Sequence, residues 1–328
     1  MTVNIYAPSP LDGLEQEENG LYKLVNRYRA RNDLPPIPAS SSLTLVANRH
    51  VLDLQENIGT LTHGWSDAPY DSSDSSTWPS MWTAPQRFNT SYPGNGYENA
   101  YWNSAGATAT SALIGWQGST GHNNVILNRS IWVDNHWNAL GVGIYEDYAV
   151  LWFGEEIDPT GAPTSLDSSI LTGNHQRNTV RGSASNDIIT GLGQRDTLAG
   201  RRGSDVIGGG AGRDKLLGGG GNDFLFGEGG NDRLVGHRGR DRLFGGGGRD
   251  VLVGGPGRDL FGLQTGNNFD IIKDFGNGND QLKLPQGSTF RDVELSQRGN
   301  TALISIDDDL LAKLRGVQIS QLSSADFQ

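Results

Sequence analysis

The chain has 328 residues, a net charge of −11 and no cysteine. Its length favours two domains, and its acidic balance argues against nucleic-acid binding and favours a cationic ligand. No apolar run is long enough to span a membrane, and the first residues lack the basic and apolar regions of a classical signal peptide. The absence of cysteine fits the cytosol or an export route that forms no disulfides.

The residue types are unevenly distributed along the chain. All eight tryptophans lie between Trp65 and Trp152, whereas more than half of the 47 glycines lie between Gly182 and Gly262. We therefore expect a globular domain followed by a repeat array. In the first part, helical spacing of apolar residues predicts helices over 14–31, 42–57 (with Ser41 or Ser42 as N-cap) and 108–118, and apolar runs predict strands over 140–145 and 148–154. This order indicates an α+β domain.

The second part carries aspartates at a constant spacing of nine residues. They are Asp187, Asp196, Asp205, Asp214, Asp223, Asp232, Asp241, Asp250 and Asp259. Two residues after each aspartate stands one large apolar side chain, and glycines fill the preceding turn, where they permit positive φ angles. We expect each unit to form a turn and a short strand, and two units to form one coil of an all-β parallel β-roll.

Stacked coils place alternate aspartates in two columns. Adjacent coils lie about 4.8 Å apart, and two carboxylates at that distance repel by about 3 kcal/mol at an effective dielectric constant near 20. A cation between the coils reverses the sign of this interaction, and carboxylate and carbonyl oxygens at a flexible spacing suit Ca²⁺ better than Mg²⁺. The predicted ligands are the nine aspartates and the backbone carbonyls of Gly200, Gly209, Gly218, Gly227, Gly236, Gly245 and Gly254.

The repeat consensus G-G-x-G-x-D-x-U-x, in which U is large and apolar, resembles the RTX (hemolysin-type) nonapeptide of calcium-binding β-rolls. One ion between each pair of neighbours in columns of five and four aspartates gives about seven calcium ions at most, and the degeneracy of the first two units at Ser185 and Gln194 would lower this number. Ordering a glycine-rich unit costs more than burial of one apolar side chain returns, so we expect the array to be unfolded without calcium. Arginine precedes the aspartate in five units, and we interpret these arginines as solvated charges.

Alternating segments at 269–275, 280–284 and 301–306 predict a few antiparallel strands after the array. They would cap the open end of the solenoid, as repeat proteins require. The segment FDIIKDFGNGNDQLKLP and residues 310–328 resemble the C-terminal flank of RTX proteins that leave bacteria by type I secretion. The resemblance implies a secreted protein, an uncleaved C-terminal export signal, and the type I secretion machinery as a partner.

Several phrases of the first domain, among them LVNRYRARNDLPPI, YENA, GWQGSTGHNNVIL and NALGVGIYEDYAVLWFG, resemble the CAP superfamily of cysteine-rich secretory, antigen-five and pathogenesis-related (SCP-like) proteins. The resemblance covers about 14–156 and implies an α-β-α sandwich with a central cleft. The family cleft commonly holds two histidines and two glutamates, which bind Zn²⁺ or another divalent ion in some members. His63, Glu98 and His122 match three of these positions, whereas Gln117 to Ser119 stand where the second glutamate would fall.

Three readings of this cleft remain open. His63, Glu98 and His122 can form a hydrogen-bonded structural network, an open zinc site completed by water, or a catalytic site with a general base. We expect His50 to be a satisfied core residue on a helix face. His136 is expected in a loop, and His175 and His237 in the linker and a repeat turn. The segment from 66 to 95 is long and rich in aromatic residues, and plain packing is favoured over a lid or recognition surface.

The expected organisation is a CAP-like domain over 1–156, a linker over 157–180, the calcium-binding roll over 181–262, and a cap with the export-signal region over 263–328. The favoured function is that of a secreted, non-enzymatic calcium-binding protein. Its roll would fold after export, and its CAP domain would bind an extracellular partner, a lipid or an envelope component. The alternatives are a divalent-metal-dependent hydrolase that uses the cleft and a cell-surface or matrix structural protein. Nucleic acid is not an expected partner.

Overall fold

The computed structural model describes residues 2–9, 12, 15–163, 169–266, 268–276 and 279–328. The chain divides into two compact units, Met1–Asn32 with Ile37–Ile170 and Asp33–Pro36 with Leu171–Gln328. Leu14, at the start of the first predicted helix, and residues 164–168 of the predicted linker lie outside the described residues. Each unit is described by itself below.

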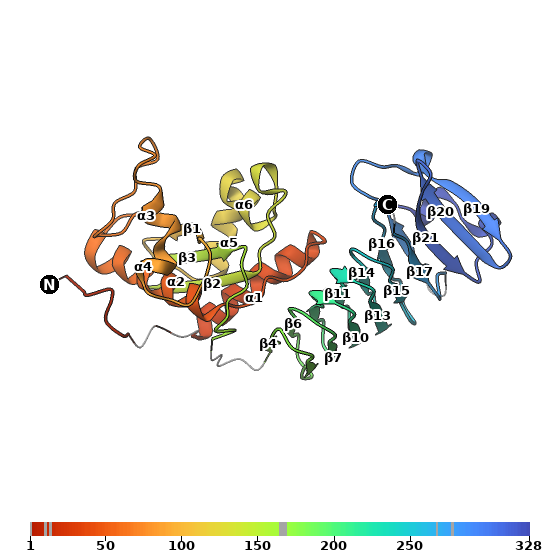
Figure 1. Ribbon diagram of the computed structural model, residues 1–328, viewed down its shortest axis with the longest axis horizontal. Coiled ribbons are helices and arrows are strands. Elements are labelled where there is room, and N and C mark those ends of the chain that lie inside the picture. The colour runs from red at the N-terminus through yellow and green to blue at the C-terminus, as the bar shows by residue number, and fades with distance from the viewer. Residues whose placement is uncertain (1, 10–11, 13–14, 164–168, 267, 277–278) are drawn as a thin grey trace. The chain divides into compact units, whose positions relative to one another are not determined.

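The first unit is built from helices around a small sheet (Figure 1). Its helical elements are α1 (Gln16–Arg31), α2 (Ser41–Asp53), the π-helical turn η2 (Leu54–Ile58), α3 (Pro79–Trp82), α4 (Ala84–Arg87), α5 (Ala109–Gly118), α6 (Thr120–Ile126) and the 3₁₀ turn η3 (Ser130–Trp132). The predicted helix over 42–57 is therefore α2 together with η2. Its N-cap is Ser40, whose Oγ accepts the N–H of Leu43 at 3.0 Å, so the prediction of Ser41 or Ser42 was wrong by one or two residues.

The sheet of the first unit has three antiparallel strands in the order β1-β3-β2, namely β1 (Tyr97–Trp102), β2 (Ala139–Tyr145) and β3 (Tyr148–Gly154). Helix α2 packs directly on β2 because the strand carries glycine where the two backbones meet. A Cβ on Gly141 would lie 2.1 Å from the Leu43 carbonyl carbon, and one on Gly143 would lie 2.6 Å from that of Ala47. The unit is the helix-and-strand domain that the sequence predicts.

The sequence did not predict β1, α3, α4 or α6. Strand β1 reads YENAYW and lacks a clean apolar alternation, although its central residues are buried. Helix α6 begins at Thr120, only two residues after α5 ends, because extended Ser119 alone separates the two helices. These elements matter because β1 carries Glu98 and α6 carries His122.

The second unit is a parallel β-roll with an antiparallel cap (Figure 1). One sheet has the order β19-β20-β21-β17-β15-β13-β10-β7-β5, a second has the order β18-β16-β14-β11-β8-β6-β4, and β12 pairs with β9. Successive strands alternate between the two large sheets, so two units of the repeat make one coil. The register keeps equivalent residues opposite one another, as in Leu216↔Leu234 and Leu234↔Leu252.

The roll strands are β4 (Ile170–Thr172), β5 (Thr179–Arg181), β6 (Ile188–Thr190), β7 (Thr197–Arg202), β8 (Val206–Gly208), β9 (Ala211–Gly212), β10 (Lys215–Gly220), β11 (Phe224–Phe226), β12 (Gly229–Gly230), β13 (Arg233–Arg238), β14 (Arg242–Phe244), β15 (Val251–Val253), β16 (Leu260–Gly262), β17 (Asp270–Ile272) and β18 (Gln281–Lys283). The cap contains β19 (Glu294–Arg298), β20 (Thr301–Ile306), β21 (Asp309–Arg315) and the short turns η4 (Phe290–Asp292), η5 (Ile319–Gln321) and η6 (Ser324–Asp326). The inward apolar residue of each repeat, from Ile189 to Phe261, is fully buried in one continuous core.

The predicted antiparallel strands after the array were partly wrong. β17 and β18 pair in parallel with β15 and β16 and so continue the roll. Their inward residues Ile272 and Leu282 are fully buried in the same core as the repeats, which is why they extend the solenoid. The antiparallel cap begins only with β19, β20 and β21.

Candidate functional site

The aspartates of the repeats stack inside the roll as two columns of buried carboxylates. Each of the nine is at most 2 % exposed. One oxygen of each carboxylate serves the fold: the N–H of Asp223 donates to Oδ1 of Asp241 at 2.9 Å, and the N–H of Asp232 donates to Oδ1 of Asp250 at 2.6 Å. The same bond joins every pair of successive aspartates in both columns. Sequence reasoning did not predict this structural role.

In seven of these aspartates the second carboxylate oxygen has no such role. Oδ2 is buried without a hydrogen-bond partner in Asp196, Asp214, Asp223, Asp232, Asp241, Asp250 and Asp259. A buried acceptor without a donor costs about 1–3 kcal/mol, and more when it is charged. Seven or so such oxygens in one small unit would be severely unfavourable without a cation.

The glycine that opens each repeat creates the space in front of this oxygen. A Cβ on Gly236 would lie 2.3 Å from Asp241 Oδ2 and 2.7 Å from the carbonyl oxygen of Gly254 in the next coil. Two acceptor oxygens therefore converge on a space that only glycine leaves open. Among the described residues, the same arrangement recurs with the carbonyls of Gly200, Gly209, Gly218, Gly227, Gly236, Gly245 and Gly254. These are the carbonyls that the sequence analysis singled out.

Burial and mutual repulsion raise the pKa values of the carboxyl groups in the columns. Burial, followed by the charges of neighbouring aspartates in the column, raises the pKa of Asp232 and of Asp241 to about 8. Burial also raises the pKa of Asp214, Asp223 and Asp259 to about 6. The columns without a cation thus favour protonated carboxyl groups, and a bound divalent ion would replace those protons.

The oxygen set fits calcium. Carboxylate and backbone carbonyl oxygens at a flexible spacing are the ligands that Ca²⁺ takes. Within the described part of the chain, no three His, Asp or Glu side chains form a metal-binding group. A calcium ion between two coils would therefore draw part of its coordination from the glycine carbonyls.

Both columns continue beyond the last repeat. The N–H of Asp250 donates to Oδ1 of Asp270 at 3.1 Å, and that of Asp259 donates to Oδ1 of Asp280 at 2.9 Å. Asp274 caps the end, because its two oxygens accept the N–H groups of Gly254 and Gly255 at 3.0 and 2.8 Å. Sequence reasoning missed all three aspartates, because the steps from Asp250 to Asp270 and from Asp259 to Asp280 are not multiples of nine. The available signal was the apolar residue two positions after Asp270 and after Asp280.

The histidines that the sequence resemblance assigned to a cleft gather around Glu98 in the first unit. Glu98 lies on β1, His63 follows η2, and His122 lies on α6. Nδ1 of His63 lies 2.6 Å from Glu98 Oε2, and the ring of His122 lies 6.4 Å from that of His63. The backbone carbonyl of His122 accepts the amide of Asn99 at 3.0 Å, which ties α6 to β1.

The fourth member of this cluster is His50, which we expected to be only a core residue. His50 is fully buried on α2, and its Nδ1 contacts Glu98 Oε1. Its Nε2 lies 3.0 Å from the carbonyl oxygen of Gly64, and its ring stacks on Trp65 at 4.4 Å. Both oxygens of Glu98 therefore face histidine rings. At the position of the missing glutamate, Gln117 is exposed at the end of α5.

The electrostatics of the cluster follow from this arrangement. Burial alone would raise the pKa of Glu98, but the contacts with His50 and His63 outweigh it and lower the pKa to about 2. Burial lowers the pKa of His63, yet the hydrogen bond and charge of Glu98 dominate and raise it. Burial and then the charge of His63 lower the pKa of His122. The cluster holds a buried anion with histidines arranged around it, and its described residues do not form a metal-binding group.

The other predicted histidines lie apart from this cluster: His136, His175 and His237 are exposed.

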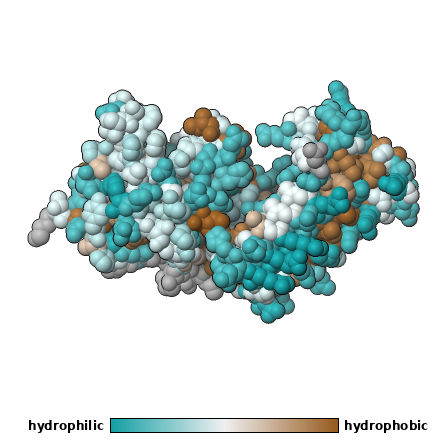
Figure 2. Space-filling model, in the orientation of Figure 1, coloured by the Kyte–Doolittle hydropathy of each residue, from teal (hydrophilic) through white to brown (hydrophobic). Residues whose placement is uncertain are grey.

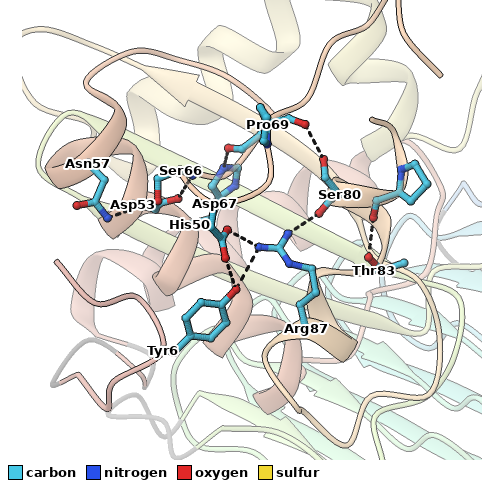
Figure 3. Close-up of polar contacts among 12 residues, drawn as sticks. Tyr6, His50, Asp53, Asn57, Ser66, Asp67, Pro69, Ser80, Thr83 and Arg87 are labelled. Atoms are coloured by element: carbon cyan, nitrogen blue, oxygen red, sulfur yellow. Dashed lines mark hydrogen bonds and ion pairs between the residues drawn. The ribbon is translucent and has the colours of Figure 1, made fainter. Parts of the chain in front are cut away.

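The segment over 66–95 is fastened to the first unit by polar contacts (Figure 3). The hydroxyl of Tyr6 donates to Asp67 Oδ2 at 2.5 Å. Within the segment, Arg87 donates to Asp67 Oδ1 at 2.8 Å and to the carbonyl of Ser80 at 2.9 Å. Oδ1 and Oδ2 of buried Asp53 accept the hydroxyl and the N–H of Ser66 at 2.6 and 2.7 Å. Tyr92 is buried at the far end of the segment. These contacts favour packing over a mobile lid.

Two family models match separate parts of the chain. Residues 22–152 match the model of the cysteine-rich secretory protein family, CAP. Residues 172–207, 203–234 and 226–261 match the model of the RTX calcium-binding nonapeptide repeat. The chain joins a CAP domain to RTX calcium-binding repeats. The RTX roll and the CAP domain are thus those that the sequence resemblances implied, and together they are the composition of a calcium-binding extracellular protein.

Solved structures with a similar fold cover one part of the chain or the other. An extracellular protein with an SCP domain from Bacillus anthracis is 24% identical over 46% of this chain and 45% of its own, with a TM-score of 0.35. An outer surface protein from Borrelia burgdorferi is 17% identical over 43% of this chain and 94% of its own, with a TM-score of 0.34. An extracellular lipase from Serratia marcescens is 19% identical over 47% of this chain and 40% of its own, with a TM-score of 0.27.

This chain therefore spans less than half of the Bacillus protein. No curated protein matches it at a significant level. Among the helices of the described residues, none is long and apolar enough to cross a membrane.

Proposed function

We propose that this is a secreted calcium-binding protein whose RTX roll folds when it meets calcium outside the cell. The observation that carries the proposal is the set of buried Oδ2 atoms without a donor. Five of them converge with a glycine carbonyl oxygen of the next coil on one space, namely those of Asp196, Asp214, Asp223, Asp232 and Asp241. The ligands we propose are the nine aspartates named from the sequence and the seven glycine carbonyls. Asp270 and Asp280 extend the columns at the cap.

Calcium supply would decide where the roll folds. Extracellular calcium modules have dissociation constants of about 10⁻⁴–10⁻³ M. With affinities in that range the roll would stay unfolded in the cytosol and fold outside. Export by the type I route, read from the C-terminal region, is compatible with this order of events, because an unfolded chain is the form that such a route would carry.

Equilibrium dialysis against calcium tests the proposal. Seven carboxylate–carbonyl spaces lie among the described residues, and we expect up to about seven ions per chain at millimolar calcium. A variant with Asn at Asp214, Asp223, Asp232 and Asp241 should lose most of them. Absence of bound calcium in the unaltered chain would overturn the proposal.

For the CAP domain we propose a binding role without catalysis. Both oxygens of Glu98 lie against the rings of His50 and His63, so we expect Glu98 to orient those rings and not to act as a general base. Its ligand would be an extracellular partner, a lipid or an envelope component. The hydrolase alternative makes a different prediction. Protein purified without chelator would contain one zinc ion per chain, and a His63→Ala plus His122→Ala variant would lose it. We expect no such zinc.

A further inference from the structure

One face of the roll carries a row of cationic side chains that calcium binding does not use. One column runs from Asp196 through every second aspartate to Asp270. The residues just before its aspartates are, in successive coils, Arg195, Arg213, Asn231, Arg249 and Phe269. Four residues line an open hollow of about 490 Å³ along this row: Arg213, Asn231, Arg249 and Asn268. That volume lies within the range of small-ligand sites, about 300–1,000 Å³.

A second row lies beside the first, on the residues just after the same aspartates. Lys215 and Arg233 are paired in register on the neighbouring strands β10 and β13, and both are exposed. Like charges directly opposite each other destabilise a sheet. None of the ion pairs between described residues involves these two side chains, Arg213 or Arg249. Folding therefore gives no reason for the cations to gather here.

The row is held in place at its C-terminal end. The guanidinium of Arg249 lies 4.3 Å from the ring centre of Phe269, and the ammonium of Lys313 lies 3.7 Å from it. Oδ1 of Asn231 accepts the N–H of Arg249 at 2.8 Å. Figure 2 shows hydrophilic side chains gathered over β7, β10 and β13, the strands that carry this face.

We propose that this face, made of Arg213, Lys215, Asn231, Arg233 and Arg249, binds an acidic polysaccharide along the axis of the roll. Arginine donates two parallel hydrogen bonds to a carboxylate, and the asparagine amides can serve sugar hydroxyls. The coils repeat at about 4.8 Å, which is close to the advance of one pyranose ring in an extended 1,4-linked chain. Successive coils could thus meet successive sugars.

Two features favour a polysaccharide over single-stranded nucleic acid. Proteins that bind single strands provide aromatic side chains on which bases stack, whereas the Phe269 ring beside this row is already covered by Arg249 and Lys313. Each uronate ring offers a carboxylate beside sugar hydroxyls, and this combination matches the mixture of arginine and asparagine on this face.

Titration calorimetry on the full chain in millimolar calcium tests the proposal. The ligand would be hexagalacturonate, with neutral maltohexaose and an oligothymidylate of similar length as controls. We expect hexagalacturonate to bind in a salt-dependent manner and the two controls not to bind. Arg213→Gln plus Arg249→Gln should weaken binding about tenfold. The matched variant, Arg240→Gln plus Arg258→Gln, removes equal charge at the same repeat position of the other column and should change affinity less than about twofold.

The outcomes separate this inference from the calcium proposal on which it rests. Circular dichroism in calcium reports whether each variant has folded its roll. A folded roll that does not bind hexagalacturonate, equal losses in the two double variants, or equal binding of the oligothymidylate would each overturn the polysaccharide site while leaving the calcium proposal intact. A roll that does not fold in calcium would contradict the calcium proposal itself.

Discussion

The backbone N–H of Asp241 donates to Oδ1 of Asp259 in the next coil, at 2.8 Å. The carboxylate of Asp259 is therefore divided between two tasks. Its Oδ1 joins one coil to the next, while its Oδ2 is buried without a partner. The same division makes further aspartates of both columns fold-stabilising acceptors and proposed calcium ligands at once, namely Asp214, Asp223, Asp232, Asp241 and Asp250.

Replacing Asp241 with Asn separates these tasks. Asparagine retains a carbonyl oxygen that can accept the N–H of Asp223, but it removes the charge. We expect the calcium concentration at the folding midpoint to rise about two- to tenfold. Circular dichroism during a calcium titration measures this shift. The control is Asp187→Asn, which changes the degenerate first unit and should have a smaller effect. Equal calcium midpoints for Asp241→Asn and the unaltered chain would count against Asp241 as a ligand.

Glycine at position 236 should be essential for the calcium response. In Gly236→Ala the new Cβ would lie 2.3 Å from Asp241 Oδ2 and 2.7 Å from the Gly254 carbonyl oxygen, where we place the ion. Overpacking of this kind costs about 1–3 kcal/mol, and the calcium titration should show it as a higher midpoint. At Gly229 an added Cβ meets nothing within 4 Å. Gly229→Ala should therefore leave the midpoint unchanged, and a matching loss there would contradict the argument.

Low pH should partly replace calcium in stabilising the roll. In the calcium-free roll the pKa of Asp232 is about 8 and that of Asp223 is about 6, above the ordinary value of 3.8. Because these folded-state values are raised, the calcium-free roll gains stability from protonation at low pH and loses it as the pH rises through about 6 to 8. In the unfolded chain the aspartates keep their ordinary pKa, so only a roll that is folded without calcium carries these protons, and calcium displaces them there.

Circular dichroism in EGTA should therefore show more β-structure at about pH 6 than at about pH 8, and the calcium needed to complete folding should be no greater at the lower pH. Identical spectra in EGTA at the two pH values would contradict the raised pKa values of the columns.

Glu98 should stabilise the CAP domain. Glu98→Gln removes the charge that faces His50 and His63, and breaking a buried pair costs about 3–5 kcal/mol. All eight tryptophans lie between Trp65 and Trp152, so tryptophan fluorescence during denaturation reports on this domain and not on the roll. Glu146→Gln changes an exposed glutamate in the same domain and should have little effect. Equal denaturation midpoints for the two variants would argue against a structural role for the cluster.

The sequence predicted the roll more completely than the cleft, for physical reasons. A period of nine residues fixes which side chain points inward, so Leu216 and Leu234 could be placed opposite each other without a structure. The period ends at Asp259, and insertions shift Asp270 and Asp280 out of phase, so their places in the columns depend on pairing that only the fold shows. The cleft has no period. His50 and Glu98 lie on a helix and a strand far apart in the chain, and no local pattern indicates that their side chains meet.

The calcium dependence of folding is tested most directly by one pair of spectra on the unaltered chain. Far-ultraviolet circular dichroism and tryptophan emission are recorded in EGTA and then in millimolar calcium. We predict a gain of β-structure signal on adding calcium with unchanged tryptophan emission, because the roll folds and the CAP domain is already folded. Identical circular dichroism spectra in EGTA and in calcium would contradict the account.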